Sequence, residues 1–191
     1  MLSGMPNSNF IGNLISIYFV GFIIKLMDDI IDEDYPEYLD KALLPYILIF
    51  LLISTIVNYK NTVGLFMAGY IVGMYTDIND KLLSGLKGYQ ESILVSILGL
   101  SILGWSAFNF YLSVIMAIHL IDDLIDIESD RKFGYSNLAV KYGKMEVFLL
   151  SLIFLILSFM LNPLKSLLVL VMAPIVNISF NKMEGVIQNC K

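Results

Sequence analysis

The stretch WSAFNFYLSVIMAIHLIDDLIDIE, residues 105–128, decides the fold. Its apolar run is long enough to cross the hydrocarbon core of a bilayer, which takes about 20 residues. The run ends in the acidic pattern D-D-x-x-D at residues 122–126. An earlier stretch, residues 10–32, follows the same plan and ends in D-D-x-x-D at residues 28–32. Both stretches predict membrane-spanning helices that carry carboxylates at one end.

The composition of the whole chain is that of an integral membrane protein. Of its 191 residues, 58% are hydrophobic and only 15% are charged, whereas soluble domains have about 45–50% apolar and about 25% charged residues. The single cysteine, Cys190, excludes an intrachain disulfide. The twelve basic residues are dispersed, so we expect no nucleic-acid binding. No basic n-region precedes the first apolar run, so we expect no cleavable signal peptide.

Seven apolar stretches have the length of membrane spans once interfacial residues are included. They cover residues 10–32, 42–59, 62–77, 88–103, 105–128, 145–161 and 165–181. Turn-forming residues separate them, at Pro36, Asn58 to Asn61, Gly85 and Gly88, Gly104, Gly143, and Asn162-Pro163. Pro174 lies within the last stretch and predicts a kink there. We therefore expect an all-α integral membrane protein with about seven transmembrane helices, in one domain over residues 1–191.

The basic residues predict an orientation in the membrane. If the acidic patterns face the cytoplasm, ten basic residues lie on that side, and only Lys60 and Lys165 lie on the other. The ten are Lys25, Lys41, Lys81, Lys87, Arg131, Lys132, Lys141, Lys144, Lys182 and Lys191. Seven crossings then place the N-terminus outside and the C-terminus inside, with both acidic patterns at cytoplasmic helix ends.

The acidic patterns indicate a site for a hard cation. On a helix, residues at i and i+4 lie on one face, so Asp122, Asp126 and Asp130 form a row of carboxylates. If the two acidic faces meet, they form an all-oxygen pocket suited to Mg²⁺, which binds phosphates in turn. The alternative is that these charges only mark helix ends in the interface. Two similar patterns on the same membrane side favour the cation site and a diphosphate substrate.

The second pattern resembles a signature of the UbiA-type intramembrane prenyltransferases. That family has D-x-x-x-D-x-x-x-D followed by K-x-G, found here at residues 122–130 and 132–134, and then a stretch rich in small hydroxyl residues that closes at Gly143. The family's first signature is N-D-x-x-D-x-x-x-D. Here Asp28 takes the place of the Asn, Asp29 and Asp32 match, and Pro36 takes the place of the last Asp, with Asp34 two residues earlier.

This resemblance implies a helical bundle around a cavity that opens to the cytoplasm. It implies that Mg²⁺ binds the diphosphate of a prenyl donor, whose prenyl group passes to a lipophilic or aromatic acceptor. The implied metal ligands are Asp28, Asp29, Asp32, Asp122, Asp126 and Asp130, of which Asp29, Asp32, Asp122 and Asp126 are the candidate catalytic residues. The implied diphosphate-binding residues are Lys81, Arg131 and Lys132. Relative to the family, we expect this chain to lack the first and last spans.

Other residues near the acidic patterns have two interpretations each. Lys132 is either a phosphate ligand or a topogenic charge, and Lys25 either pairs with the first acidic pattern or binds substrate. His119 is either an acid or base near the site or a packing residue. A prenyl diphosphate that loses its diphosphate leaves an allylic carbocation. Four aromatic residues could stabilise this carbocation by cation–π contact, although packing is the favoured interpretation for each. They are Tyr18, Phe22, Phe108 and Tyr111.

Three other functions fit parts of the pattern. A catalytically inactive homologue would bind prenyl diphosphate without transferring it. A membrane cation-binding or transport protein would use the carboxylates as an ion site, but no acidic relay crosses the apolar stretches. Soluble prenyl diphosphate synthases also carry D-D-x-x-D pairs. We reject that class because its helices are amphipathic, whereas these are apolar nearly all round.

Overall fold

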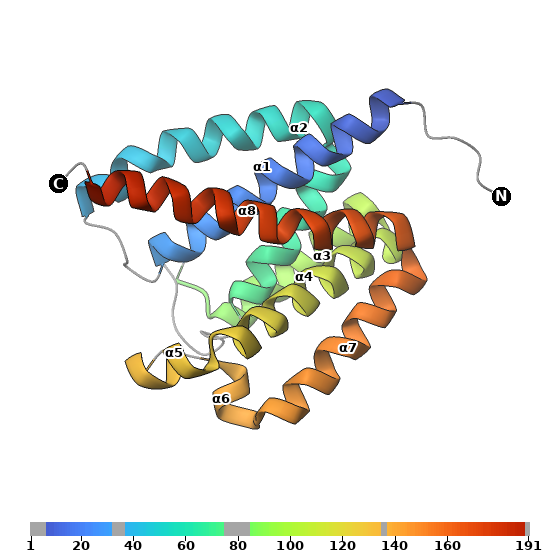
Figure 1. Cartoon of the computed structure of the whole chain (residues 1–191). Helices are drawn as coiled ribbons and strands as arrows, with labels where there is room; N and C mark the ends of the chain where they lie inside the picture. The colour runs from blue at the N-terminus through green and yellow to red at the C-terminus, as the bar shows by residue number, and fades with distance from the viewer. Residues whose placement is uncertain (1–6, 32–36, 75–84, 135–136, 190–191) are drawn as a thin grey trace. The chain divides into compact units, whose positions relative to one another are not determined.

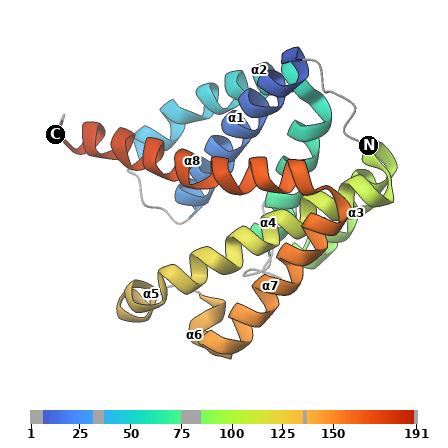
Figure 2. The same cartoon turned by 45° about the vertical axis from the view of Figure 1, so that its right-hand side comes forward.

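The structure is a computed structural model that describes residues 7–31, 37–74, 85–134 and 137–189. This part of the chain is helical almost throughout and contains no β-strand, which confirms the all-α prediction. Figures 1 and 2 show the helices in two views. The helices are α1 (Asn7–Ile31), α2 (Glu37–Gly73), α3 (Gly88–Leu103), α4 (Trp105–Ile125), α5 (Ile127–Phe133), α6 (Leu138–Tyr142), α7 (Lys144–Leu161) and α8 (Pro163–Asn189).

Five helices in the described part of the chain are long and apolar enough to cross a membrane. They are Phe10–Met27 in α1, Pro45–Gly73 in α2, Trp105–Ile125 (α4), Lys144–Leu161 (α7) and Pro163–Phe180 in α8. Helix α3 is apolar but shorter, at 16 residues. Two of the seven predicted stretches begin within α2, so the count of seven stays a prediction. Many large apolar side chains of these helices are exposed, as expected for surfaces that face lipid.

The chain divides into two compact units, and the first, unit 1, is Met1–Phe66 with Leu168–Lys191. Figure 1 shows α1, the first part of α2 and most of α8 side by side in this unit. Their buried core is formed by Ile23, Leu26, Ile47 and Phe180. The ring of Phe22 packs edge-on against those of Phe50 and Phe180, with centroids 5.9 and 5.6 Å away. Helix α8 continues through Pro174, which therefore does not end it.

Unit 2, Met67–Leu167, is built around α4. Helix α4 packs mainly against α7, and α6 packs against both. The core where these three helices meet contains Leu120, Ala139 and Val147. Helix α3 reaches α4 through Gly99, where any Cβ would overlap the ring of Phe108. Gly104 joins the two helices with φ 79° and ψ 166°, a conformation that favours glycine.

The helix turns at Asn58 and Asn162 have nearly the same backbone. Their φ/ψ values are −157°/92° and −158°/91°. In each, the side-chain Oδ1 accepts the backbone N–H of the residue three positions later, at 3.2 Å from Asn61 and 3.1 Å from Lys165. Each asparagine thus caps the helical segment that follows it. Each is also flanked at four residues on either side by a fully buried hydroxyl residue, namely Ser54 and Thr62 or Ser158 and Ser166.

Candidate active site

The second acidic pattern lies where α4 ends and α5 begins. Asp126 separates the two helices, but the hydrogen bonding continues through it. The Asp126 N–H donates to the Asp122 carbonyl at 2.9 Å, and the Asp130 N–H donates to the Asp126 carbonyl at 2.9 Å. The three aspartates therefore sit one helical turn apart, as their spacing predicts. Asp122 and Asp126 are exposed, and Asp130 is half-buried.

Asp123 is the buried carboxylate of this cluster, with 8% of its surface exposed. Its Oδ2 accepts the backbone N–H of Leu138, the first residue of α6, at 3.0 Å. Its backbone carbonyl accepts a hydrogen bond from the Asn137 side-chain amide at 2.8 Å. The same amide donates to Asp130 Oδ2 at 2.7 Å, and the Asn137 Oδ1 caps α6 by accepting from Val140 N–H at 3.0 Å. Asn137 thereby ties α4, α5 and α6 together.

Burial has the largest effect on the Asp123 carboxylate, and its charged neighbours have smaller ones. Asp123 interacts unfavourably with the carboxylates of Asp126 and Asp130, and favourably with His119. His119 lies one turn earlier on α4 and is half-buried. A cation bound to the exposed carboxylates would offset this repulsion, since opposite charges stabilise the ionised form of a carboxyl group.

The carboxylates fit Mg²⁺ only as part of a larger site. Among the residues that the structure describes, no group of three or more His, Cys, Asp or Glu side chains is arranged to hold a metal ion. Mg²⁺ differs from metals that need such a cage, because it is usually bound by one or two carboxylates together with water and substrate phosphates. Asp122 and Asp126, exposed and one turn apart, match that requirement. Phosphate oxygens would have to complete the site.

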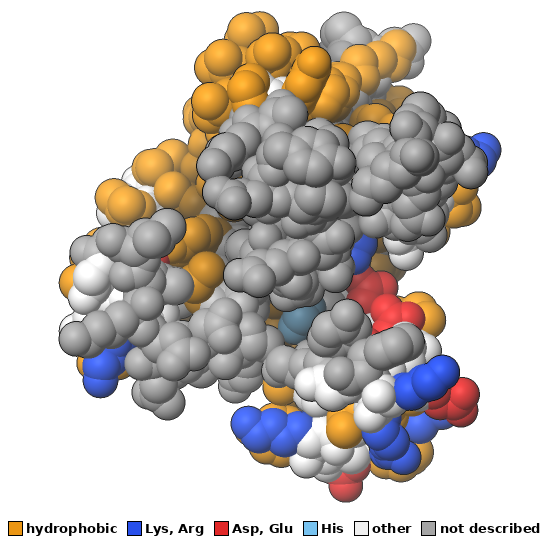
Figure 3. Space-filling view, turned by 90° about the vertical axis from the view of Figure 1, so that its left-hand side faces the viewer, with side chains coloured by type: hydrophobic (Ala, Val, Ile, Leu, Met, Phe, Trp, Pro, Cys, Tyr) orange, Lys and Arg blue, Asp and Glu red, His pale blue; other side chains and the backbone are white. Residues whose placement is uncertain are grey.

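Basic residues follow the acidic ones on α5. Arg131 and Lys132 are exposed in its last turn, and Gly134 ends the helix in the left-handed conformation with φ 79°. Figure 3 shows acidic side chains near basic ones on this face. Cations near a helix C-terminus are stabilised by the helix dipole, so their position alone does not assign them to a phosphate. It does place positive charge within a few residues of the carboxylates.

The first acidic pattern falls largely outside the described residues. Asp32 and Lys81 lie outside them altogether. Asp28 and Asp29 belong to the last turn of α1, but their side chains are not among those described. Lys25, on the same helix, is half-buried. The first pattern belongs to unit 1 and the second to unit 2, so a site shared by both stays a prediction.

Two of the candidate aromatic residues are packing residues. Phe22 belongs to the core of unit 1, and Phe108 fills the space left by Gly99 in unit 2. Tyr18 stacks on Phe22, with ring centroids 6.5 Å apart. Tyr111 is buried beside Lys165, at the opposite end of α4 from the acidic cluster.

Asp123 and Asn137 have structural roles that were not predicted from the sequence. Asp123 had a detectable signal, because it continues at helical spacing the buried stripe of α4 formed by Val114, Ala117 and Leu120. Asn137 has the signal of a helix cap, an asparagine directly before a short apolar run. Its bonds to two aspartates depend on tertiary structure and have no signal in the sequence.

Comparisons with protein-family models, with curated proteins and with solved structures found no match for this chain. The resemblance to the UbiA-type prenyltransferases therefore rests on the residues of the two acidic patterns alone.

Proposed function

We propose that this protein is a membrane-embedded, Mg²⁺-dependent prenyltransferase. Its donor would be a polyprenyl diphosphate, and its acceptor a lipophilic or aromatic molecule. The observation that carries the proposal is the pair of D-D-x-x-D patterns, each at the end of an apolar helix of spanning length. Two patterns with the same spacing, on the same predicted side of the membrane, are difficult to explain as charges that only mark helix ends.

The residues of the second pattern have distinct roles in this proposal. Asp122, Asp126 and Asp130 hold the metal, while Asp123 and Asn137 fix the helix end that carries them. Arg131 and Lys132 neutralise phosphate oxygens. On sequence grounds, Asp28, Asp29 and Asp32 are further metal ligands, and Lys81 is a further phosphate ligand. Bound Mg²⁺ would neutralise the charge on the leaving diphosphate.

The transfer reaction needs little from the protein beyond positioning and shielding. The bond between the prenyl C1 and the diphosphate oxygen breaks, and the diphosphate leaves with the electron pair. The acceptor forms a bond to C1 and gives up a proton. Apolar helices exclude water, which would otherwise capture the allylic cation.

The proposal includes seven crossings, with the N-terminus outside and the C-terminus inside. The non-helical backbone at Asn58 supports counting the two arms of α2 separately, and α3 supplies a further short crossing.

Cys190 is the only cysteine, so it reports the side of the C-terminus without any substitution. We expect a membrane-impermeant maleimide to label it only after the cells are permeabilised. Labelling in intact cells would contradict this orientation.

The donor site is tested by thermal unfolding of the detergent-solubilised protein with geranylgeranyl diphosphate, with and without Mg²⁺. A ligand that binds only the folded state stabilises it by about 2.7 kcal/mol at a hundredfold excess over its Kd. For a chain of this size that corresponds to a rise in Tm of roughly 5–10 °C. We expect this rise only when Mg²⁺ and the diphosphate are both present.

Two variants make the test specific. Asp126→Asn removes an exposed carboxylate of the pattern, so it should abolish the Tm shift without lowering the Tm of the free protein. Glu128→Gln removes an exposed carboxylate two residues away that is outside the pattern, so it should retain the shift. A shift with Mg²⁺ alone would instead favour an ion-binding protein. A full shift without product formation from any acceptor would identify an inactive homologue.

A further inference from the structure

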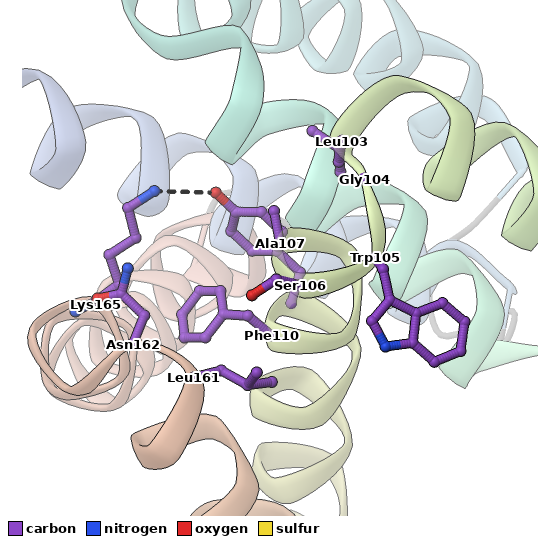
Figure 4. A pocket seen from close by; sticks show the side chains of 10 residues that line it. Leu103, Gly104, Trp105, Ser106, Ala107, Phe110, Leu161, Asn162 and Lys165 are labelled. Atoms are coloured by element: carbon purple, nitrogen blue, oxygen red, sulfur yellow. Dashed lines mark hydrogen bonds between the residues drawn. The ribbon is translucent and has the colours of Figure 1, made fainter.

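A pocket of about 400 Å³ lies in unit 2 at the end of α4 opposite to the acidic cluster. It is formed where α3 passes into α4 and where α7 passes into α8, as Figure 4 shows. Its lining residues are Leu103, Gly104, Trp105, Ser106, Ala107, Phe110, Tyr111, Leu161, Asn162 and Lys165. Since α4 has 21 residues, which rise about 1.5 Å each, the pocket lies roughly 30 Å from Asp126. It is therefore separate from the proposed active site.

The lining residues of the pocket include one basic side chain and no acidic one. Lys165 is its only ionisable side chain other than the phenol of Tyr111, because its ten lining residues include no carboxylate. The Lys165 ammonium donates a hydrogen bond to the Tyr111 hydroxyl at 3.3 Å and lies 5.7 Å from the centre of that ring. Tyr111 is only 2% exposed, so the ammonium is anchored on a buried ring. Lysines at the ends of spanning helices usually extend into the interface instead.

Backbone groups add to the positive character of this pocket. Helix α4 begins at Trp105, and Gly104 before it provides no side-chain cap. The first-turn residues Trp105, Ser106 and Ala107 all line the pocket. Helix α8 also begins here, directly after Asn162. Asn162 caps the start of α8, so the uncapped N-terminal end of α4 is the one that adds positive potential to that of Lys165.

The position of the pocket indicates a ligand with an apolar part. Leu103, Phe110 and Leu161 supply apolar lining. Trp105 is 75% exposed at the very start of a spanning helix, the position at which tryptophans commonly lie at lipid headgroups. An anion that reaches the pocket from the membrane would be a lipid. Its negative charge would be on the headgroup, and its apolar chains would lie beside the helices.

We propose that this pocket binds the phosphate of an anionic lipid headgroup. The negative charge of such a phosphate is attracted by the ammonium of Lys165, the one basic side chain among the lining residues. The hydroxyl of Ser106 and the amide of Asn162 are further hydrogen-bonding groups at the same place. This proposal does not depend on the prenyltransferase activity, since the acidic cluster lies at the other end of α4.

Trp105 makes the proposal directly testable, because it is the only tryptophan in the chain and lines the pocket. The whole protein is placed in phosphatidylcholine nanodiscs that contain a small fraction of bromine-labelled lipid, either phosphatidylglycerol or phosphatidylcholine. Bromine on the acyl chains quenches tryptophan fluorescence on contact. One lysine near the membrane surface attracts an anionic lipid. We therefore expect phosphatidylglycerol to occupy the position beside Trp105 about fivefold more often than phosphatidylcholine.

Three variants identify the group responsible. Lys165→Gln should reduce the preference to about one, while Lys165→Arg should retain it because the charge remains. Lys60→Gln is the matched control and should also retain it, since Lys60 is an exposed lysine at the corresponding turn of unit 1. Equal quenching by both lipids in the unaltered protein would overturn the proposal, as would a preference that survives in Lys165→Gln. Inorganic phosphate added in detergent separates the sources: a change in Trp105 emission without lipid preference would overturn the lipid assignment.

Discussion

The turn at Asn58 in unit 1 and the turn at Asn162 in unit 2 share a backbone but differ in what fills them. In unit 1, the position three residues after the asparagine is Asn61, which is fully buried. Its side-chain amide donates to Asn13 Oδ1 at 2.9 Å and to Ser16 Oγ at 3.2 Å. The Asn58 amide also donates to Asn13, at 2.7 Å. This turn is closed by neutral amides that satisfy one another.

In unit 2, the corresponding position is Lys165. Its ammonium donates a hydrogen bond to the hydroxyl of Tyr111, and the space beside it is a pocket of about 400 Å³. The two turns therefore have the same cap and backbone, but they differ in the residue three positions later and in what surrounds it. A neutral amide gives a packed polar core, and a lysine accompanies an open pocket.

The largest expected effect comes from placing a lysine in the closed turn. Asn61→Lys buries a charge among Asn13, Ser16 and Asn58, and we expect a loss of about 3 kcal/mol in the free energy of unfolding, measured by denaturation in mixed micelles. The reverse change, Lys165→Asn, is the control and should cost less than about 1 kcal/mol, because it removes a charge from an open pocket. Equal losses would show that the two interiors do not differ as described.

A smaller loss is expected when the amide network of unit 1 loses its acceptor. Asn13→Ala leaves the amides of Asn58 and Asn61 without the Oδ1 that both now use. We expect unfolding to become easier by about 2 kcal/mol. Asn109→Ala is a control in unit 2, because its amide bonds only to the carbonyl of Trp105 in its own helix, and it should change Tm little. A Tm for Asn13→Ala close to that of the unaltered protein would contradict the network.

The two units can also be compared through their helix contacts. Gly99→Ala in unit 2 places a methyl group inside the ring of Phe108, so we expect a cost of about 1.5 kcal/mol. Gly12→Ala in unit 1 places its Cβ 3.4 Å from Val57 Cγ1, which is nearly ordinary contact, and should be neutral or stabilising. Thermal unfolding of the two variants side by side measures the difference. A stabilising Gly99→Ala would mean that α3 and α4 are not closely packed.

The smallest effects should come from removing the caps themselves. Asn162→Ala loses the bond to the Lys165 N–H and should cost about 1 kcal/mol. Asn58→Ala loses the same cap and also its bond to Asn13, so its cost should be larger. Chemical denaturation of both variants gives the difference. If the two variants were equally stable, the amide of Asn58 would contribute nothing beyond its cap.

Much of the helical plan could be predicted from the sequence. Apolar runs and their breakers located the long helices, and the turns at Asn58, Gly104, Gly143 and Asn162 lie where turn residues predicted them. Helices α5 and α6 could not be found this way, because they have only 7 and 5 residues. Membrane spans are located from the average hydrophobicity of about 20 consecutive residues, and a helix of 5 or 7 residues cannot be distinguished from its neighbours in such an average.

The candidate site was predictable in its spacing but not in its burial. The pattern placed Asp122, Asp126 and Asp130 on successive turns, and the structure does the same. It gave Asp123 no role, because the prediction followed the row of carboxylates rather than the buried stripe of α4. The hydrogen bond between Lys165 and Tyr111 joins residues 54 positions apart, and no local pattern predicts it.

The hydrogen bond from the Leu138 N–H to the Asp123 carboxylate joins two residues that are 15 positions apart in the chain. Next to Leu138, the side-chain amide of Asn137 donates a second hydrogen bond, to the carboxylate of Asp130. Asp126 and Arg131 both lie in sequence between Asp123 and Leu138. These two hydrogen bonds connect the start of α6 to the end of α4 and to α5, the segments that carry the acidic residues and the basic residues after them.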